Sequence, residues 1–367
     1  MRVLVDARES YRNKTGIGTV ARNLCLRLGR QSGYVCLPAD YQLREPASSL
    51  YRSLPRLLLN LVRHVLWKQL YLPAKMLTTG AHVLFCPDPV GPLWTQGKVV
   101  VTVHDLIFFR YPKEVNRWWG LYWRTVLPLC LRRADSIIAI SEATKQQLNS
   151  ILGIRQEKVT VAYDGYDSQL FYRIADIEAL RFVHAKYKLP ERFILFVGSI
   201  ERRRNIETLL RAVAYLRDKQ GLTLPIVIAG GRTNHASHLE SVILEQGLQD
   251  QVVWLGYVPD EDLPLLYNVA TMYVYPSIAE GFGLTMLEAM ACGCPVICSN
   301  VDSLPEVAGE ACILLSPTDT EGFAGAIRRV WMDTTLAQTM REKGLAQAQR
   351  FSWENMAEIV AHVCEEI

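Results

Sequence analysis

The sequence lacks a long apolar run. No window reaches the ~18 consecutive apolar residues that a membrane-spanning helix needs. The opening "MRVLVDARES" meets the charge of Asp6 after a stretch too short for the apolar region of a signal peptide. The sequence therefore predicts neither secretion nor a spanning segment. We expect a cytoplasmic protein that at most lies on the inner face of the cell membrane.

Strong net charge and clustered metal-binding motifs are also missing. The formal net charge of the 367 residues is only +3, so no basic field marks nucleic acid as a partner. The nine cysteines are dispersed, and the tightest group, Cys292, Cys294 and Cys298, has no paired CxxC spacing and no neighbouring histidine. This pattern favours free thiols in a reducing compartment over a metal site.

What is present is an alternation of short apolar runs with longer helical patterns, which is typical of parallel sheets with crossover helices. The chain is too long for one ordinary core, so we expect two doubly wound, Rossmann-like α/β domains, residues 1–175 and 176–350. The expected strands are 2–7, 82–87, 98–105, 136–141 and 158–163, then 193–199, 225–231, 252–257, 272–277, 295–300 and 312–317. Ligands of such sheets bind at the carboxyl ends of strands, so a cleft between the facing domains is the expected site.

The loop after the expected strand 272–277 carries two glutamates, Glu280 and Glu288, on either side of "GFGLTML". Gly281 and Gly283 allow the backbone to approach a ligand, and the amides at the following helix start attract a phosphate. Carboxylates accept hydrogen bonds from hydroxyl groups, so the pair suits a hydroxyl-rich phosphorylated ligand. The alternative is that both glutamates are ordinary surface charges.

A basic turn follows the expected strand 193–199. Arg202, Arg203 and Arg204 lie between this strand and a helix, where guanidinium groups can hold a diphosphate. We interpret Arg202 as solvated, and Arg203 and Arg204 as the candidate anion ligands.

Two further candidate segments lie in the first half of the sequence, each close to an expected strand. "TGIG" places Gly16 and Gly18 before a helix, although it is not a complete GxGxxG motif. His104 follows the buried strand 98–105, where a functional histidine competes with an ordinary core histidine. No acidic residue stands out at a second strand end, which weighs against a nicotinamide-dependent dehydrogenase.

In order and spacing, these segments resemble glycosyltransferase family 4, a retaining family with the GT-B fold. The resemblance covers nearly the whole chain and rests on "EGFGLTMLE" (280–288), "GSIERRRN" (198–205), "TGIG" (15–18), "VHDLIFFRYP" (103–112) and "ADSIIAISEATKQQL" (134–148). It implies transfer of a sugar from a nucleotide diphosphate to an acceptor hydroxyl with retained configuration, without a metal. It also implies that residues 351–367 form a helix that crosses back to the first domain.

The resemblance implies roles for individual residues. The residues implied in catalysis are His104, Glu280, Arg203 and Arg204, and those implied in donor binding are Gly16, Gly18, Ser199, Phe282, Gly283, Leu284, Thr285 and Glu288. Within these sets, Glu280 meets the donor sugar, the arginines stabilise the leaving diphosphate and Glu288 holds the ribose. The phosphate loop departs from the usual family pattern at Ser199 and Arg204, which leaves the division of labour between Arg203 and Arg204 open.

The segment "YRSLPRLLLNLVRHVLWKQLYLPAKML" (51–77) contains Lys and Arg but no acid. At helical spacing, Arg56, Asn60, Arg63, His64 and Lys68 form a polar stripe on an apolar helix, a pattern typical of an anionic membrane surface. We therefore predict membrane or acceptor contacts for Arg56, Arg63 and Lys68. The alternative is an internal helix whose polar stripe is merely solvated.

Together these features predict a glycosyltransferase that uses a nucleotide sugar and a polyprenyl-diphosphate-linked saccharide acceptor in exopolysaccharide or O-antigen synthesis. The resemblance favours GDP-mannose as donor. A UDP-sugar-dependent enzyme of the same fold, and a nucleotide-sugar-binding protein without activity, are the alternatives.

Overall fold

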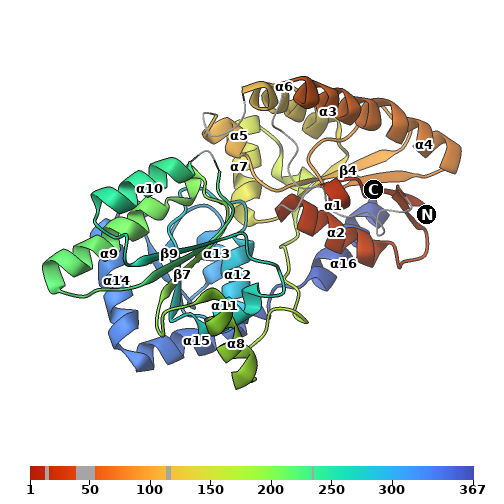
Figure 1. Ribbon diagram of the computed structural model, residues 1–367. Coiled ribbons are helices and arrows are strands. Elements are labelled where there is room, and N and C mark those ends of the chain that lie inside the picture. Colours follow the sequence, from red (N-terminus) through yellow and green to blue (C-terminus); the bar gives the residue numbers. More distant parts are fainter. Residues whose placement is uncertain (13–15, 39–53, 113–116, 234) are drawn as a thin grey trace. The chain divides into compact units, whose positions relative to one another are not determined.

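The computed structural model describes residues 1–12, 16–38, 54–112, 117–233 and 235–367. The chain divides into two compact units (Figure 1): unit 1 contains Met1–Gly165 and Ser352–Ile367, and unit 2 contains Tyr166–Phe351. The chain passes from unit 1 to unit 2 between Gly165 and Tyr166, which is earlier than the boundary at residue 175 expected from the sequence. The residues from Tyr166 to the suggested boundary therefore belong to unit 2.

Unit 1 is built on a six-stranded parallel sheet of order β2-β1-β3-β4-β5-β6. The five strands expected in this half are confirmed, whereas β2 was not expected. Its strands are β1 Val3–Asp6, β2 Tyr34–Leu37, β3 Val83–Cys86, β4 Lys98–Val103, β5 Ser136–Ala139 and β6 Val159–Val161. The strand order reverses between β1 and β3, so that is the switch point of this sheet.

Unit 2 repeats the design with a six-stranded parallel sheet of order β12-β11-β10-β7-β8-β9. Its strands are β7 Ile194–Val197, β8 Ile226–Ala229, β9 Val252–Gly256, β10 Met272–Tyr275, β11 Val296–Ser299 and β12 Ile313–Leu315, and all six were expected. The switch point lies between β7 and β10. The two loops singled out in the sequence, the arginine turn and the glutamate loop, follow these two strands.

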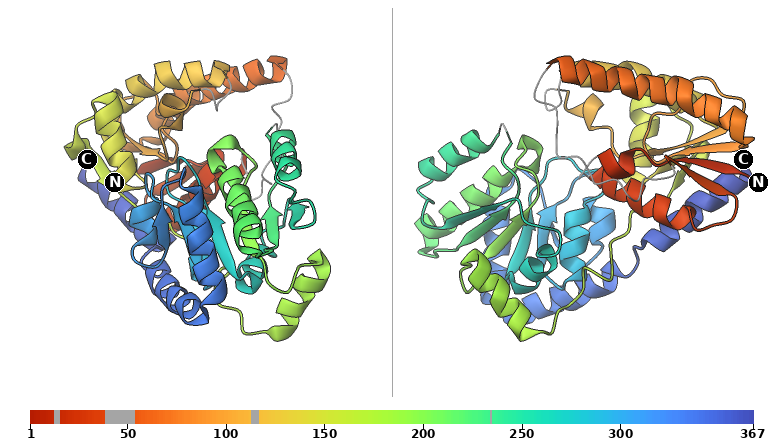
Figure 2. Two further views of the ribbon diagram at one scale, coloured as in Figure 1. Left: turned by 90° about the vertical axis from the view of Figure 1, so that its left-hand side faces the viewer. Right: turned by 45° about the vertical axis from the view of Figure 1, so that its right-hand side comes forward.

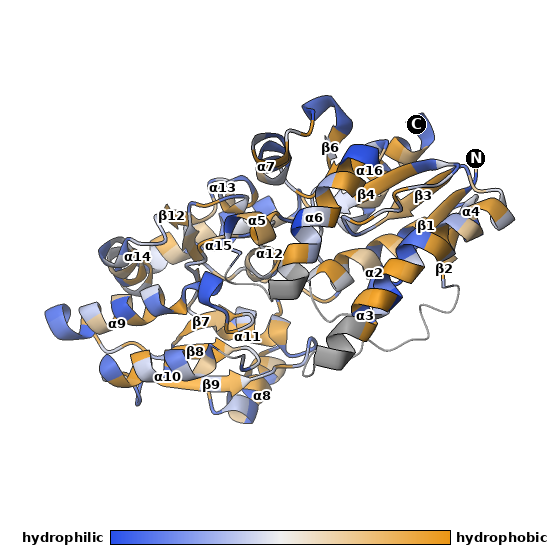
Figure 3. Ribbon diagram, turned by 90° about the horizontal axis from the view of Figure 1, so that it is seen from above, coloured by the Kyte–Doolittle hydropathy of each residue, from blue (hydrophilic) through white to orange (hydrophobic). Residues whose placement is uncertain are grey.

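The inner strands of each sheet are buried on both faces, and helices cover both sides of each sheet (Figure 2). The strands accordingly stand out as apolar in Figure 3. The helices of unit 1 are α1 Glu9–Arg12, α2 Gly16–Leu28, α3 Leu54–Leu66, α4 Leu72–Thr79, α5 Ile107–Arg110, α6 Arg117–Arg133, α7 Glu142–Leu152 and α16 Trp353–Glu366. Those of unit 2 are α8 Ile177–Tyr187, α9 Ile206–Gln220, α10 Ala236–Glu245, α11 Leu263–Val269, α12 Leu284–Ala291, α13 Leu304–Ala308, α14 Thr320–Met332 and α15 Thr334–Ala348. Among the described residues, no helix combines the length and the apolar character needed to cross a bilayer.

The C-terminal helix α16 is part of unit 1 and packs against α2. Arg27 and Glu354 form an ion pair of 2.6 Å between these two helices. Gly165 lies directly against the start of α16, since a Cβ atom at this position would come within 2.1 Å of the Trp353 amide nitrogen. Any other residue at 165 would push the two segments apart.

The long helical segment after the undescribed residues 39–53 corrects the interpretation of its polar stripe. Helix α3 continues through a π-helical turn, Trp67–Tyr71, into α4. His64 and Lys68 are buried, at 5% and 0% exposure, so the predicted membrane contact of Lys68 is wrong and the stripe does not face solvent as a whole. Arg63 is exposed, and the side chain of Arg56 lies outside the described residues. The outward face instead carries apolar side chains exposed by 48% to 62%, namely Leu59, Val62, Leu66, Leu70 and Leu77.

Candidate functional site

The arginine turn of unit 2 follows β7 and is held in a fixed shape. Residues Arg202–Arg204 form a short 3-10 turn, and Asn205 ends it with a left-handed φ of 53°. Asparagine tolerates this conformation better than most residues. The Asn205 side-chain amide donates to the carbonyl oxygens of Pro276 at 2.9 Å and Pro317 at 2.8 Å. The turn after β7 is thereby fastened to the segments that follow β10 and β12.

Glu280 contacts the guanidinium groups of two of the three arginines of this turn, Arg203 and Arg204. Nη1 of Arg204 donates to Glu280 Oε1, and Nη1 of Arg203 lies 3.4 Å from each carboxylate oxygen. The Tyr275 hydroxyl also donates to Oε1, at 2.8 Å. The backbone amide of Glu280 donates to Asp302 Oδ2 at 3.0 Å, which fixes the loop itself. Two cations and one carboxylate therefore meet at the switch point between β7 and β10.

Glu280 and Arg204 stay charged although both side chains are largely buried. Glu280 is 7% exposed, and burial alone would raise its pKa, but the positive charges of Arg204 and Arg203 outweigh that effect. The pKa of Glu280 therefore lies below its ordinary value. Burial would lower the pKa of Arg204, yet Glu280 raises it overall. Glu280 is thus a carboxylate and Arg204 a cation throughout the neutral range.

Helix α12 begins directly after the glutamate loop. Gly283 precedes it with a φ of 102°, a conformation that side-chain-bearing residues rarely adopt, and a Cβ atom there would lie 2.8 Å from Leu304 Cδ2. The first amides of any helix, here those of Leu284 and Thr285, have no acceptor within the helix. The Thr285 hydroxyl lies 2.9 Å from the hydroxyl of Tyr273. The loop thus presents backbone donors at the same sheet edge as the arginines.

Glu288 lies one turn further along α12 and has a different environment. The hydroxyl of Tyr267 donates to its Oε2 at 3.3 Å. Burial raises the pKa of Glu288 to about 8, an effect that the Tyr267 hydrogen bond only partly offsets. The two glutamates that flank the loop therefore differ in protonation: near pH 7 Glu280 is ionised and Glu288 is mostly neutral.

In unit 1, His104 lies at the carboxyl end of β4 and is 6% exposed. Its Nε2 is 2.8 Å from the carbonyl oxygen of Pro87, so this nitrogen carries the proton and donates. Burial lowers the pKa of His104, and the contact with Pro87 offsets this only in part. The imidazole is therefore neutral at pH 7, with Nδ1 as its acceptor.

Gly16 and Gly18 lie in the first turn of helix α2 rather than in a loop ahead of it. Gly16 is exposed and Gly18 is buried, while Thr15 of the same motif lies outside the described residues. Their predicted contact with the donor phosphates stays a prediction.

The structure also shows a buried charged triad that sequence reasoning missed. Lys68 Nζ lies 2.6 Å from Asp6 Oδ2 and 2.7 Å from Asp88 Oδ2. Asp6 ends β1 and Asp88 follows β3, so Lys68 occupies the switch point of the first sheet. Burial would lower the pKa of Lys68, but the two carboxylates raise it above its ordinary value. Two features of the sequence could have revealed this triad: an aspartate at or just after the end of each of two strands, and a lysine in a helical segment that contains no acidic residue.

Within unit 2, the structure thus brings Arg203, Arg204 and Glu280 into direct contact. Ser199, Phe282, Gly283, Leu284 and Thr285 belong to the segments that follow β7 and β10 at the same sheet edge. Glu288 contacts Tyr267 rather than the arginine cluster.

Comparisons with known proteins agree with this architecture. The family model described as Glycosyltransferase Family 4 matches residues 14–170, and the one described as Glycosyl transferases group 1 matches residues 176–347. O-antigen chain mannosyltransferase B of Escherichia coli is 34% identical over 259 residues, which cover 70% of this chain and 68% of that protein. Serotype-specific mannosyltransferase WbdA of Escherichia coli is 32% identical over 231 residues, which cover 62% of this chain and 28% of WbdA.

Among solved structures, Anabaena Alr3699/HepE in complex with UDP and glucose has a TM-score of 0.76 and 19% identity, over 100% of both chains. This likeness confirms the GT-B type of α/β fold expected from the sequence. The two parallel Rossmann-like sheets, the two family models in order and the relative with 34% identity over 259 residues agree: the chain belongs to glycosyltransferase family 4.

Proposed function

We propose that this glycosyltransferase moves a mannosyl residue from GDP-mannose to a hydroxyl group of a polyprenyl-diphosphate-linked saccharide, with retention of the anomeric configuration. The observation that carries the proposal is the cluster of Arg203, Arg204 and Glu280 at the switch point between β7 and β10. Mannose is favoured because the relatives with 34% and 32% identity are both named as mannosyltransferases, the first of the O-antigen chain and the second serotype-specific.

Donor binding would rearrange this cluster. The diphosphate carries the negative charge that Glu280 supplies in the free protein, so it would draw Arg203 and Arg204 away from the carboxylate. Arg204 Nε is a buried donor without an acceptor among the described side chains and backbone, and a phosphate oxygen would satisfy it after this shift. Glu280 would then accept hydrogen bonds from the sugar hydroxyls.

The positive charges of Arg203 and Arg204 would also assist the transfer step. The bond between the sugar C1 and the diphosphate oxygen breaks, and the arginines stabilise the charge that grows on the leaving group. The acceptor oxygen bonds to C1 from the same face and passes its proton to the departing phosphate oxygen. No metal is required, because two guanidinium groups supply the positive charge. Glu288 would hold the ribose, and neutral His104 would orient the donor sugar through Nδ1.

The enzyme is proposed to lie on the membrane that holds its acceptor, through apolar rather than basic contacts. An outward stripe along α3, the π-helical turn and α4 is formed by Leu59, Val62, Leu66, Leu70 and Leu77, with Arg63 exposed among them. A stripe of this kind inserts into the boundary between lipid headgroups and acyl chains, and a neighbouring cation favours anionic lipid. The interface would supply both the anchor and the lipid-linked acceptor.

The test is an equilibrium binding screen of the full chain against GDP-mannose, UDP-glucose and dTDP-glucose, followed by turnover assays. We expect GDP-mannose to bind most tightly, to hydrolyse slowly without acceptor, and to transfer mannose to a lipid-linked saccharide in the presence of a chelator. Preference for a UDP-sugar would overturn the donor assignment. Binding with neither hydrolysis nor transfer would leave a nucleotide-sugar-binding protein, and loss of transfer with the chelator would contradict the metal-free step.

A further inference from the structure

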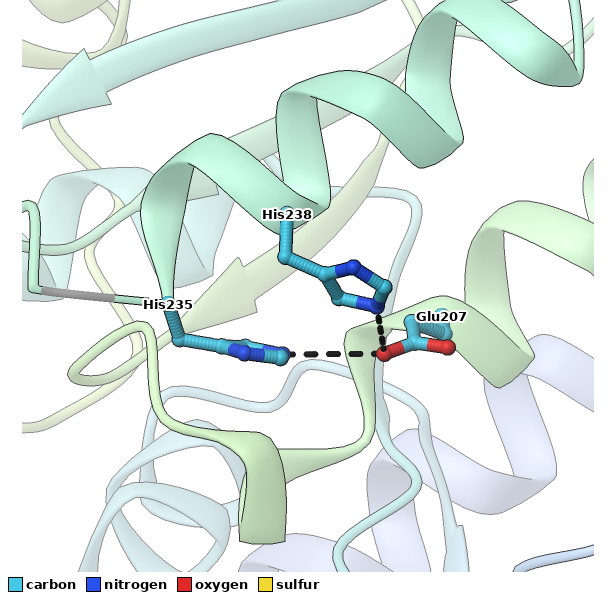
Figure 4. A group of neighbouring side chains, drawn as sticks. All are labelled: Glu207, His235 and His238. Carbon is cyan, nitrogen blue, oxygen red and sulfur yellow. Dashed lines mark hydrogen bonds and ion pairs between the residues drawn. The ribbon is translucent and has the colours of Figure 1, made fainter.

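Three side chains of unit 2 converge on one point at the edge of the arginine turn (Figure 4). Glu207 comes from the first turn of α9, His235 precedes α10 and His238 lies in its first turn. One ligand atom from each residue lies within 4.8 Å of the other two. His238 Nε2 is 2.9 Å and His235 Nε2 is 3.6 Å from the same oxygen, Glu207 Oε1. Both imidazole rings therefore aim a nitrogen at a single carboxylate oxygen.

The chemistry of this donor set is that of a borderline transition metal. Two imidazole nitrogens and one carboxylate oxygen are ligands that zinc prefers, with a fourth position left for water. Zinc bonds of about 2.1 Å in tetrahedral geometry place neighbouring ligand atoms about 3.4 Å apart. The observed separations of 2.9 Å and 3.6 Å bracket that value. Small side-chain shifts would open the space for an ion.

The surroundings orient the carboxylate and leave the site accessible. The other carboxylate oxygen, Glu207 Oε2, pairs with Arg211 at 3.4 Å one turn along α9. An outer partner of this kind fixes the direction of a ligand and tunes its affinity. Glu207 and His235 are partly buried and His238 is exposed, so an ion can enter directly from solvent.

We propose that Glu207, His235 and His238 bind one divalent transition-metal ion, with zinc as the native class, and that this ion fastens the start of α9 to the start of α10. Thr233, which precedes α10, already donates its hydroxyl to the carbonyl oxygen of Ile200. A bound ion adds a second link through Glu207, on the other side of the turn that carries Arg202–Arg204. The ion is structural: it stabilises unit 2 and does not take part in the transfer step.

The test uses the full chain without a polyhistidine tag, stripped of metal by a chelator and then dialysed. We expect Co²⁺, used as a spectroscopic probe, to bind in a one-to-one ratio and to give the visible absorption of a site with imidazole and carboxylate ligands. Zinc should displace Co²⁺. At free zinc about a hundredfold above its Kd, the unfolding midpoint should rise by about 5 to 10 °C.

Variants identify the ligands. Glu207→Gln and His238→Gln should each weaken Co²⁺ binding at least about tenfold, because each removes one ligand. His362→Gln is the matched control, since His362 is an exposed histidine that pairs with Glu366 on α16 and lies outside the cluster. Circular dichroism of the metal-free variants would establish that they are folded.

The proposal stands apart from the transferase activity. It is overturned if the wild-type chain shows no Co²⁺ absorption and no zinc-dependent stabilisation, because the cluster would then be a hydrogen-bonded Glu–His pair. It is equally overturned if the Co²⁺ spectrum survives unchanged in both Glu207→Gln and His238→Gln. Turnover of His238→Gln at a temperature below its unfolding midpoint should equal that of the wild type.

Discussion

The hydroxyl of Tyr275 donates to Oε1 of Glu280 at 2.8 Å, so the last residue of β10 holds the carboxylate of the following loop in place. Arg204 contacts both groups, which makes the three side chains one unit. The strand end, the arginine turn and the glutamate loop are thus joined by side-chain contacts at one edge of the sheet.

Glu280→Gln tests this organisation. The change keeps the shape of the side chain but leaves two partly buried guanidinium groups without their shared charge. We expect a loss of about 3 kcal/mol in the free energy of unfolding and a fall in turnover of about a hundredfold. Calorimetry and a transfer assay would measure the two effects. Glu201→Gln is the control, because Glu201 also pairs with Arg203 but is 43% exposed, and it should cost less than about 1 kcal/mol. Equal effects of the two variants would contradict a special role for Glu280.

The raised pKa of Glu288 predicts that nucleotide binding releases a proton. In the free protein Glu288 has a pKa of about 8 and is mostly protonated at pH 7. Ribose hydroxyls that donate to the carboxylate favour its ionised form and lower that pKa. Titration calorimetry at pH 7 in buffers of different ionisation enthalpy should show release of up to about 0.9 proton per nucleotide. Glu288→Gln should show none, and release that persists in this variant would assign the proton to another group.

The same group links stability to pH in the free protein. Because its folded pKa lies above the ordinary value of 4.5, the folded state holds a proton that the unfolded state loses. The stability that Glu288 contributes is therefore complete below pH 4.5 and is lost as the pH rises to about 8. Denaturant unfolding of the wild type and Glu288→Gln across this pH range would measure the effect: the free energy of unfolding should fall more steeply with pH in the wild type than in the variant.

The triad of unit 1 predicts a large effect from a single lysine. Lys68→Met leaves Asp6 and Asp88 buried without their cation, and we expect a loss of about 3 to 5 kcal/mol in the free energy of unfolding. Arg63→Met, five residues earlier on the exposed side of α3, should change it by less than about 0.5 kcal/mol. Urea unfolding would compare the two variants. A small loss for Lys68→Met would mean that the charges of the triad are solvated.

The apolar stripe predicts which substitutions release the enzyme from lipid. Leu66→Gln combined with Leu70→Gln should weaken binding to vesicles that contain anionic lipid at least about tenfold, since each leucine contributes about 1 to 2 kcal/mol when it is buried in the interface. Leu244→Gln removes an equally exposed leucine of unit 2, on α10, and should leave binding unchanged. Vesicle flotation would report the bound fraction. Equal binding of all three proteins would remove the stripe from the membrane interface.

His104→Ala separates catalysis from packing. If neutral His104 orients the donor sugar, turnover should fall at least about tenfold while the Kd for the donor changes much less. The pH profile of the wild type should show no limb from His104 near neutrality, because burial holds its pKa low. Unchanged turnover would make His104 an ordinary core residue that bonds to Pro87.

Of the twelve strands in the described part of the chain, the sequence predicted eleven, because continuous apolar runs are the mark of parallel strands buried on both faces. It missed β2: the segment Tyr34–Leu37 is apolar in composition, but it is only four residues long and only partly buried, too short a run to stand out as a strand. The loops at the switch point of unit 2 were also identified, because glycines, arginines and glutamates stood at the ends of recognisable strands.

The polar stripe of residues 51–77 shows where sequence reasoning reached its limit. Helical periodicity separates two faces of a helix but does not say which face is buried. Lys68 is buried because Asp6 and Asp88, far away in the sequence, neutralise it at the switch point. The π-helical turn also shifts the helical phase at this lysine. Only the three-dimensional arrangement reveals both effects.

The return of the chain to unit 1 sets an order of events during synthesis. Unit 2 is one continuous segment, Tyr166–Phe351, whereas unit 1 needs Ser352–Ile367 as well as its first 165 residues. A ribosome therefore releases every residue of unit 2 before it releases α16, the helix that covers α2. While unit 2 is being synthesised, α16 is absent and that face of α2 stays uncovered. A truncated transcript or a late ribosome stall therefore leaves unit 1 incomplete and prone to aggregation.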